Sequence, residues 1–238
     1  MTTQPSSVLL PPGGQRILVI QAHPDDAEFL CGGTVARLVA EERDVQYLFL
    51  TYGEQGSDDP EMTPDRLAAI REQEQRRAAD FLGVKSVTFL AGYHDGEIEP
   101  TLALRRELAG MIRRLKPDIV LSFDPWAKND VHAHPDHRAT AVCALDAMAV
   151  ARGRLSYPDQ LVDGITPHSV QHIYFYGTDR PNHWVDISST IDIQLAALHL
   201  HTSQMQGFED EFIRRRAIQA GAELKYTYAE VFHRFSMA

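Results

Sequence analysis

The regular alternation of short apolar runs with longer helical patterns is the feature that most restricts how this chain can fold. Four runs rich in β-branched and aromatic residues, typical of buried strands, each precede a segment with helical periodicity. Strands are expected at Arg16–Ala22, Val45–Thr51, Ser86–Leu90 and Asp118–Phe123, and helices at Ala27–Glu42, Thr63–Leu82, Leu102–Leu115 and Pro135–Ala151. This order predicts an α/β fold with a mostly parallel, Rossmann-like sheet that has helices on both faces.

The turn after the first predicted strand carries three potential metal ligands. Residues 21–34 read QAHPDDAEFLCGGT, which places His23, Asp25 and Asp26 between strand and helix. Ligands of open α/β sheets bind at the carboxyl ends of strands, and imidazole and carboxylate are both good ligands for zinc. Because adjacent carboxylates do not usually point the same way, one Asp is expected to bind the metal and the other to face its water. The alternative is that both aspartates only cap the helix.

A second group of histidines, after the fourth predicted strand, decides between these alternatives. The loop DPWAKNDVHAHPDH contains His132, His134 and His137, and a helix is expected to begin at Pro135, the favoured first helical position. One accidental cluster is plausible in a chain with 11 histidines, but two His/Asp clusters in strand-to-helix turns are improbable as accidents. The pair favours a metal site over helix caps or solvated loop histidines.

Together, the two motifs resemble those of the LmbE/PIG-L family of zinc-dependent N-deacetylases. The resemblance rests on AHPDDAE followed by GGT, and on HPDHRA further along the chain. It implies that His23, Asp26 and His137 bind zinc (Zn2+), although iron(II) (Fe2+) is chemically compatible with the same ligands. It also implies a small amino-sugar substrate that contains N-acetylglucosamine, from which a metal-dependent hydrolase removes the N-acetyl group.

The resemblance implies the catalytic groups as well. Asp25 would be the general base that takes a proton from the attacking water. His134 would stabilise the oxyanion or protonate the departing amine. Asp136, in the same HPDH turn, would act on His134 and raise the pKa of its ring.

Three further residues are implied as substrate contacts. Glu54 lies in a Thr-x-Gly-Glu-x-Gly loop, Arg71 in an Arg-x-x-Glu pattern with Glu74, and Asp95 in an Asp-Gly step. Each has a simpler interpretation from the residues alone: a solvated turn for Glu54, a surface ion pair with Glu74 for Arg71, and an ordinary turn for Asp95.

The last third of the chain continues the resemblance more weakly. It is expected to contain strands at residues 171–176, 183–187 and 228–235, and helices within residues 187–204 and 209–221. His201, Ser203 and Gln204 match a family His-x-Ser-Gln pattern, whereas Gln194 stands where relatives often carry a lysine. Residues 1–238 are expected to form a single deacetylase-like domain, and residues 1–15 a polar lead-in.

Charge and composition exclude several classes of partner. The formal net charge of −10 argues against nucleic acid or an anionic membrane as the main partner. No apolar run is long enough for a membrane span, and the first residues lack the features of a secretory signal. Cys31 and Cys143 are expected to be buried free thiols, which favours a cytoplasmic location. A homo-oligomer is compatible with these properties.

Three other functions remain open. A dinucleotide-binding domain is disfavoured, because no G-x-G-x-x-G pattern follows the first strand. An amidase acting on S-conjugates of low-molecular-weight thiols is a first alternative within the resemblance. A non-catalytic metal-binding protein is an alternative of another class, and the presence of Asp25 argues against it.

Overall fold

The computed structural model describes residues 16–235, which form a seven-stranded sheet in the order β3-β2-β1-β4-β5-β7-β6. The strands are β1 (Arg16–Gln21), β2 (Asp44–Phe49), β3 (Ser86–Phe89), β4 (Ile119–Phe123), β5 (His172–Tyr176), β6 (His183–Asp186) and β7 (Ala229–Phe235). The first five strands pair in parallel, and β7 is antiparallel to both β5 and β6. The predicted fold class is confirmed.

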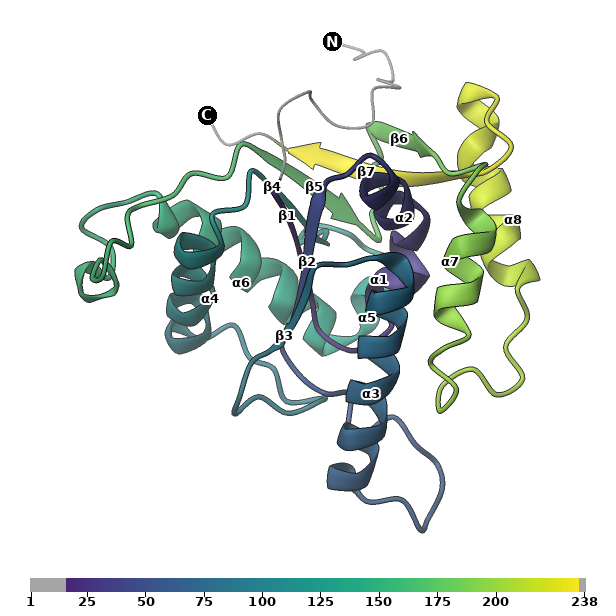
Figure 1. Ribbon diagram of the computed structural model, residues 1–238, viewed down its shortest axis with the longest axis horizontal. Helices are drawn as coiled ribbons and strands as arrows, with labels where there is room; N and C mark the ends of the chain where they lie inside the picture. Colours follow the sequence, from purple (N-terminus) through teal and green to yellow (C-terminus); the bar gives the residue numbers. More distant parts are fainter. Residues whose placement is uncertain (1–15, 236–238) are drawn as a thin grey trace.

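Helices cover both faces of this sheet. They are α1 (Asp26–Leu30), α2 (Gly32–Ala40), α3 (Pro64–Leu82), α4 (Leu102–Leu115), α5 (Asp130–Ala133), α6 (Pro135–Ala151), α7 (Ile191–Leu198) and α8 (Glu211–Gly221), with short 3-10 turns η1 (Pro158–Gln160) and η2 (Ala222–Leu224). Figure 1 shows α4 and α6 on one side of the sheet, and α2, α3 and α7 on the other. The alternation of strands and helices therefore produces the expected three layers.

Local signals account for the bounds of α3. The Thr63 side chain accepts a hydrogen bond from the Arg66 backbone N–H at 3.3 Å, and Pro64 occupies the first helical position. Gly83 ends the helix with φ of 80°, a conformation that costs glycine little. This helix was predicted with these ends from the sequence.

The predicted helix Ala27–Glu42 is wrong in one respect, because the chain breaks it into α1 and α2 at Cys31. The two glycines that follow the break lie against distant side chains. A Cβ on Gly32 would lie 2.9 Å from Gln194 Cγ, and one on Gly33 would lie 2.9 Å from Ile187 Cβ. Close packing against residues near α7, rather than a local stop signal, sets this geometry. Similarly, α7 is shorter than the predicted segment 187–204.

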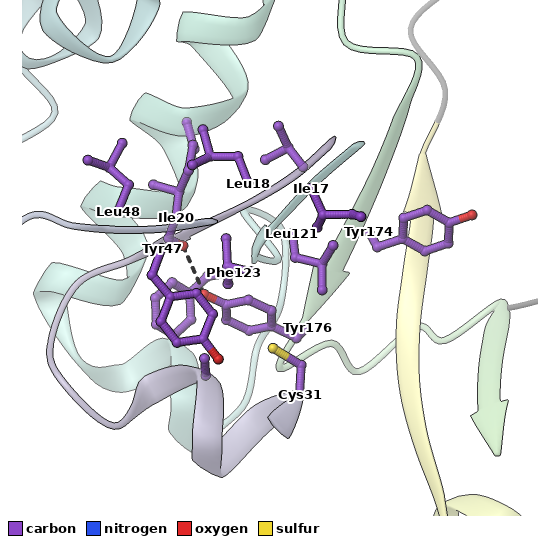
Figure 2. Close-up of a cluster of buried hydrophobic side chains, with 14 of the residues drawn as sticks. Ile17, Leu18, Ile20, Cys31, Tyr47, Leu48, Leu121, Phe123, Tyr174 and Tyr176 are labelled. Carbon is purple, nitrogen blue, oxygen red and sulfur yellow. Dashed lines mark hydrogen bonds between the residues drawn. The ribbon is translucent and has the colours of Figure 1, made fainter. Parts of the chain in front are cut away.

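The core is built around β1, whose apolar side chains are fully buried between its neighbours β2 and β4. Figure 2 shows Ile17, Leu18 and Ile20 of β1 among aromatic side chains, with the Tyr176 hydroxyl donating a 2.9 Å hydrogen bond to the Ile20 carbonyl. Burying a side chain of this size stabilises the fold by about 1.5–3 kcal/mol. The strand order reverses between β1 and β4, so the loops after these two strands meet at one end of the sheet.

Two other expectations concern the chain as a whole. Cys31 and Cys143 are free and buried, as predicted. No helix within residues 16–235 is both long enough and apolar enough to cross a membrane. The predicted lead-in, residues 1–15, lies outside the described residues, and the single domain 1–238 stays a prediction.

Candidate active site and metal centre

The turn after β1 holds Asp25 in an unusual backbone conformation. Its φ of 85° lies in the left-handed region, which costs a residue other than glycine on the order of 1–3 kcal/mol and is concentrated at functional sites. Two side chains of α3 hold it there: Gln75 Oε1 accepts the Asp25 backbone N–H at 2.9 Å, and Arg71 lies 3.1 Å from Asp25 Oδ2. The Asp25 side chain caps no backbone N–H of α1, which argues against the interpretation as a helix cap.

The two adjacent aspartates point to different partners. Asp26 Oδ2 accepts the backbone N–H groups of Ala22 and His23 at 3.1 and 2.8 Å, and Asp26 Oδ1 lies 3.2 Å from His137 Nε2. Burial alone would raise the pKa of Asp26, but the neighbouring histidines and the backbone hydrogen bond lower it. Burial raises the pKa of Asp25 to about 6 despite the opposing Arg71 charge. Asp26 is therefore a stable anion, while Asp25 has a proton affinity suited to a general base at neutral pH.

His137 has one ring nitrogen committed to the backbone. Its Nδ1 lies 2.7 Å from the Val131 carbonyl, which can only accept, so this nitrogen carries a proton, and Nε2, which faces Asp26 at 3.2 Å, is the nitrogen left for a metal ion. The ring stacks on Phe123 at 4.2 Å between centroids. Burial would lower the pKa of His137, but the Asp26 carboxylate raises it. An imidazole fixed in this tautomer has the arrangement of a typical metal ligand.

His23 also has one nitrogen occupied by carboxylates. Its Nε2 lies 2.9 Å from Asp136 Oδ2 and 3.0 Å from Asp95 Oδ1, while Nδ1 lies 3.8 Å from Asp26 Oδ2. Burial opposes the charged form, yet these carboxylates raise the pKa of His23 to about 10. A metal bound at Nδ1 would replace the second proton and leave the Nε2–H to the carboxylates.

These donors fit a divalent metal ion. Among residues 16–235, the side chains of two groups have potential ligand atoms that all lie within 4.8 Å of one another: His23, His134 and His137, and His23, Asp95 and Asp136. The Asp26 carboxylate lies beside the first group, 3.8 Å from His23 Nδ1 and 3.2 Å from His137 Nε2. Two imidazole lone pairs and one carboxylate oxygen are a donor set that zinc and iron(II) both accept. The sequence-predicted ligands are thus brought together.

Asp136 takes a different position from the one expected. We predicted that its carboxylate would act on His134, but it accepts the backbone N–H groups of Gly96 and Ile98 at 2.7 and 3.2 Å and contacts His23. Only the Asp136 backbone N–H reaches His134, donating to Nδ1 at 3.3 Å. Burial and the charges of His23 and His137 lower the pKa of His134, and they outweigh the Asp136 charge, which raises this pKa as predicted, so the net shift of the pKa is downward.

The three predicted substrate contacts separate in the structure. Arg71 and Asp95 line one cavity with the metal-binding groups, whereas Glu54 lines a neighbouring cavity. Glu54 Oε1 accepts the Asp95 backbone N–H at 3.1 Å and so supports the Asp95 loop. Arg71 makes no ion pair with Glu74, whose carboxylate instead accepts hydrogen bonds from Thr202 and Ser203. Packing between α3 and the segment after α7 therefore overrides the local i,i+3 pairing.

The cavity has a volume of about 400 Å³, which is within the range of small-molecule sites. Arg71, Asp95 and Gln204 give one part of its lining hydrogen-bonding groups, and Phe29 and Phe212 give another part aromatic surface. Neither phenylalanine was predicted as a site residue. An aromatic residue several positions from a motif carries no sequence signal of its own.

Gln75, which holds the base in place together with Arg71, was not predicted from the sequence. The Gln75 side chain links Asp25 to Glu28, because its Nε2 donates to Glu28 Oε1 at 3.0 Å while Oε1 accepts from Asp25. Glu28 Oε2 lies 3.7 Å from His201 Nε2, and the Glu28 and His201 side chains are completely buried. The helical spacing of Arg71 and Gln75, four residues apart on α3, is the signal that could have indicated Gln75.

We expect Gln75→Leu to lower kcat about tenfold to a hundredfold with little change in bound metal. The substitution keeps the volume but removes the acceptor that holds the left-handed Asp25 backbone, so the base is misplaced. The matched control is Gln73→Leu, because Gln73 is exposed on the same helix. Steady-state kinetics with metal analysis and circular dichroism check the result. Unchanged kcat in a folded, metal-loaded Gln75→Leu protein would contradict this role.

Comparison with known proteins places the chain in a family. Residues 18–148, more than half of the chain, match the family model of PIG-L, described as GlcNAc-PI de-N-acetylase. The chain belongs to this deacetylase family. The matched region contains all nine sequence-predicted site residues, and the resemblance inferred from the two motifs is confirmed.

Relatives within this family extend the match over most of the chain. The diacetylchitobiose deacetylase of Thermococcus kodakarensis is 36% identical over 220 residues, covering 91% of this chain and 81% of that protein. The 1D-myo-inositol 2-acetamido-2-deoxy-alpha-D-glucopyranoside deacetylase of Mycobacteroides abscessus is 27% identical, with 82% and 84% covered. The structure of N,N'-diacetylchitobiose deacetylase from Pyrococcus horikoshii, 31% identical, has a TM-score of 0.89 and covers 94% of this chain and 85% of its own.

Proposed function

We propose that this protein is a metal-dependent hydrolase that removes the N-acetyl group from an N-acetylglucosamine-containing sugar. The observation that carries the proposal is the position of Asp25, a buried base held by Arg71 and Gln75 directly beside a His/Asp donor set. A purely metal-storing site needs no such base. Membership of a family whose named relatives are deacetylases of acetamido sugars supports the same reaction.

The metal is proposed to be zinc, with iron(II) as the alternative, held by His23, Asp26 and His137. When bound, such an ion supplies Lewis-acid chemistry, because it polarises an amide carbonyl and makes water more acidic. Asp136 and Asp95 would keep His23 oriented, and the Val131 carbonyl would do the same for His137. Metal analysis of the purified protein identifies the ion.

The proposed proton transfers use Asp25 and His134. Asp25 accepts one proton from water while the oxygen of that water attacks the amide carbon. The C–N bond then breaks to release acetate and the free amine. The Asp136 backbone N–H donates to His134 Nδ1, so the neutral ring carries its own proton on Nε2. In that form His134 donates a hydrogen bond to the developing oxyanion without needing the charged form. Asp25, once protonated, returns its proton to the departing amine.

The sugar is proposed to bind beside Asp95 and Arg71. Asp95 keeps a carboxylate in the cavity. Burial alone would raise its pKa, but the hydrogen bond and charge of His23, together with the Gln55 backbone hydrogen bond and the Arg71 charge, lower it to about 2. An ionised carboxylate accepts hydrogen bonds from sugar hydroxyls. Glu54 is proposed to act on the substrate through the Asp95 loop.

A comparison of amide substrates tests the proposed function. We expect acetate release from N-acetylglucosamine compounds and their short oligomers, and little from acetyl-lysine peptides, because the cavity of about 400 Å³ fits a sugar better than a long chain. The measurement is coupled detection of acetate with the metal-loaded protein. Rapid hydrolysis of the peptides, with none of the sugars, would overturn the proposal.

We further propose a cytoplasmic location, which the two buried free thiols support. Formation of a homo-oligomer stays a prediction. Sedimentation velocity on the purified protein measures it directly.

A further inference from the structure

A buried carboxylate and a buried imidazole face each other close to Asp25. The side chains of Glu28, on α1, and His201, three residues after the end of α7, are completely buried, and Glu28 Oε2 lies 3.7 Å from His201 Nε2. This separation is that of an ion pair rather than of a hydrogen bond. Burial alone would lower the pKa of His201, but the carboxylates of Glu28 and Asp25 raise it. The two side chains are therefore charged partners in the protein interior.

The Glu28 carboxylate depends on this imidazole for its counter-charge. An isolated carboxylate is costly to remove from water, so a buried one needs a cation or several hydrogen bonds. Among residues 16–235, His201 is the cationic side chain within ion-pair distance of Glu28. Loss of the imidazole would leave a buried charge without a partner of opposite sign.

The second oxygen of the Glu28 carboxylate sets the direction of the Gln75 amide. Glu28 Oε1 accepts a hydrogen bond from Gln75 Nε2 at 3.0 Å, and Gln75 Oε1 accepts the Asp25 backbone N–H at 2.9 Å. A side-chain amide has donors at one end and an acceptor at the other, whereas an ionised carboxylate can only accept. The Glu28 anion therefore turns the Gln75 amide so that its oxygen faces Asp25.

The segment after α7 is attached to both helices that carry these contacts. Gln194 Nε2, on α7, donates to the Glu28 carbonyl of α1 at 2.8 Å. The Thr202 and Ser203 hydroxyl groups donate to the Glu74 carboxylate of α3 at 2.7 and 2.6 Å. The imidazole is thus held in a fixed position relative to α1 and α3.

We propose that His201 is a positioning residue, which supplies the counter-charge of Glu28 and thereby keeps Gln75 in the orientation that holds Asp25. The contacts run from His201 to Glu28, from Glu28 to Gln75, and from Gln75 to the Asp25 backbone. This inference rests on the proposed function for its effect on turnover and deepens it, because it extends the support of the base to a segment far along the chain.

Removal of the counter-charge, followed by neutralisation of its partner, tests the pairing. His201→Leu leaves Glu28 as an unpaired buried carboxylate, so we expect Tm to fall by about 5–15 °C and kcat to fall about tenfold. Adding Glu28→Gln removes that charge and keeps an oxygen that can accept from Gln75. The double variant should regain most of the lost Tm and kcat. No gain in kcat over His201→Leu would overturn the proposal, and recovery of Tm alone would make the pair a stabilising contact only.

A second comparison separates an effect through Gln75 from a general effect on the fold. His201→Leu should hardly change kcat when Gln75 has already been replaced by leucine, because the two substitutions then break the same series of contacts. Equal losses of kcat with and without Gln75→Leu would contradict the proposed role. His199→Leu is the matched control, because His199 lies two residues away and forms an exposed ion pair with Asp210, and its kcat and Tm should stay close to those of wild type.

Hydrogen exchange of the Asp25 backbone amide gives a readout that does not depend on catalysis. Its hydrogen bond to Gln75 protects this amide from exchange, which is followed by NMR relative to the amides of the core strand β4. We expect faster relative exchange in His201→Leu and recovery when Glu28→Gln is added. Equal relative exchange in wild type and His201→Leu would refute the positioning role. If wild type releases no acetate from any N-acetylglucosamine compound, the proposed function fails, and the exchange result still decides the role of His201.

Discussion

Asp25→Asn is expected to lower the rate of amide hydrolysis by roughly a hundredfold to ten-thousandfold while the metal stays bound. The substitution removes the proton acceptor but keeps the size of the side chain and an oxygen that can accept from Arg71. The hydrogen-bond and ion-pair partners of Asp25 are Arg71 and Gln75 rather than the three histidines of the convergent group, so metal affinity should change little. The expected signature is a fall in kcat with metal content close to that of wild type.

Acetate release and metal analysis on the same samples check this result. Asp80→Asn is the control, because Asp80 is exposed on α3 and the substitution changes the net charge equally. The assignment also predicts the opposite pattern for the neighbouring residue: Asp26→Asn should lose metal, because Asp26 lies beside both His23 and His137. If Asp25→Asn loses the metal and Asp26→Asn retains it, the roles of the two aspartates are reversed.

His137→Ala is expected to lose most of the bound metal and nearly all hydrolysis. With three protein ligands, removal of one leaves a two-donor site whose affinity is far lower. A ligand that binds only the native state also raises its stability in proportion to RT ln(1 + [L]/Kd). Zinc should therefore raise the Tm of wild type and leave that of His137→Ala nearly unchanged, which gives a readout independent of catalysis.

Two neighbouring histidines make this test specific. His132→Ala is the matched control, because His132 lies in the neighbouring helix α5 and belongs to neither group of convergent ligand atoms. His134→Ala should keep the metal and lose turnover, since His134 is assigned to the oxyanion. Full metal occupancy in His137→Ala, or loss of metal only in His134→Ala, would show that the ligand set is wrong.

Local signals in the sequence were sufficient for the regular elements. Thr63, Pro64 and Gly83 act within α3 itself, and α4 and α6 have the predicted bounds for comparable reasons. The two motif turns were placed correctly because parallel strands put their carboxyl ends at one edge of the sheet. Strand order then brought β1 and β4 together, and with them Asp26 and His137.

Longer-range contacts decided what the sequence did not predict. The break at Cys31 depends on packing of Gly32 and Gly33 against residues near α7, far away in the chain. The direction of the Asp136 carboxylate depends on the backbone of Gly96 and Ile98, which offers N–H donors that no local pattern announces.

The sequence was sufficient for the fold class, the family and the two motif turns that form the centre of the site. Residue type and spacing encode these features, because the period of the hydrophobic pattern and the chemistry of the motif side chains can be read from residues close together in the sequence. The partner of each side chain was decided by the tertiary structure, such as His23 for Asp136 and Asp25 for Arg71. The physical reason is that hydrogen bonds and ring contacts depend on distances of a few ångströms, which are set by packing between elements remote in the chain.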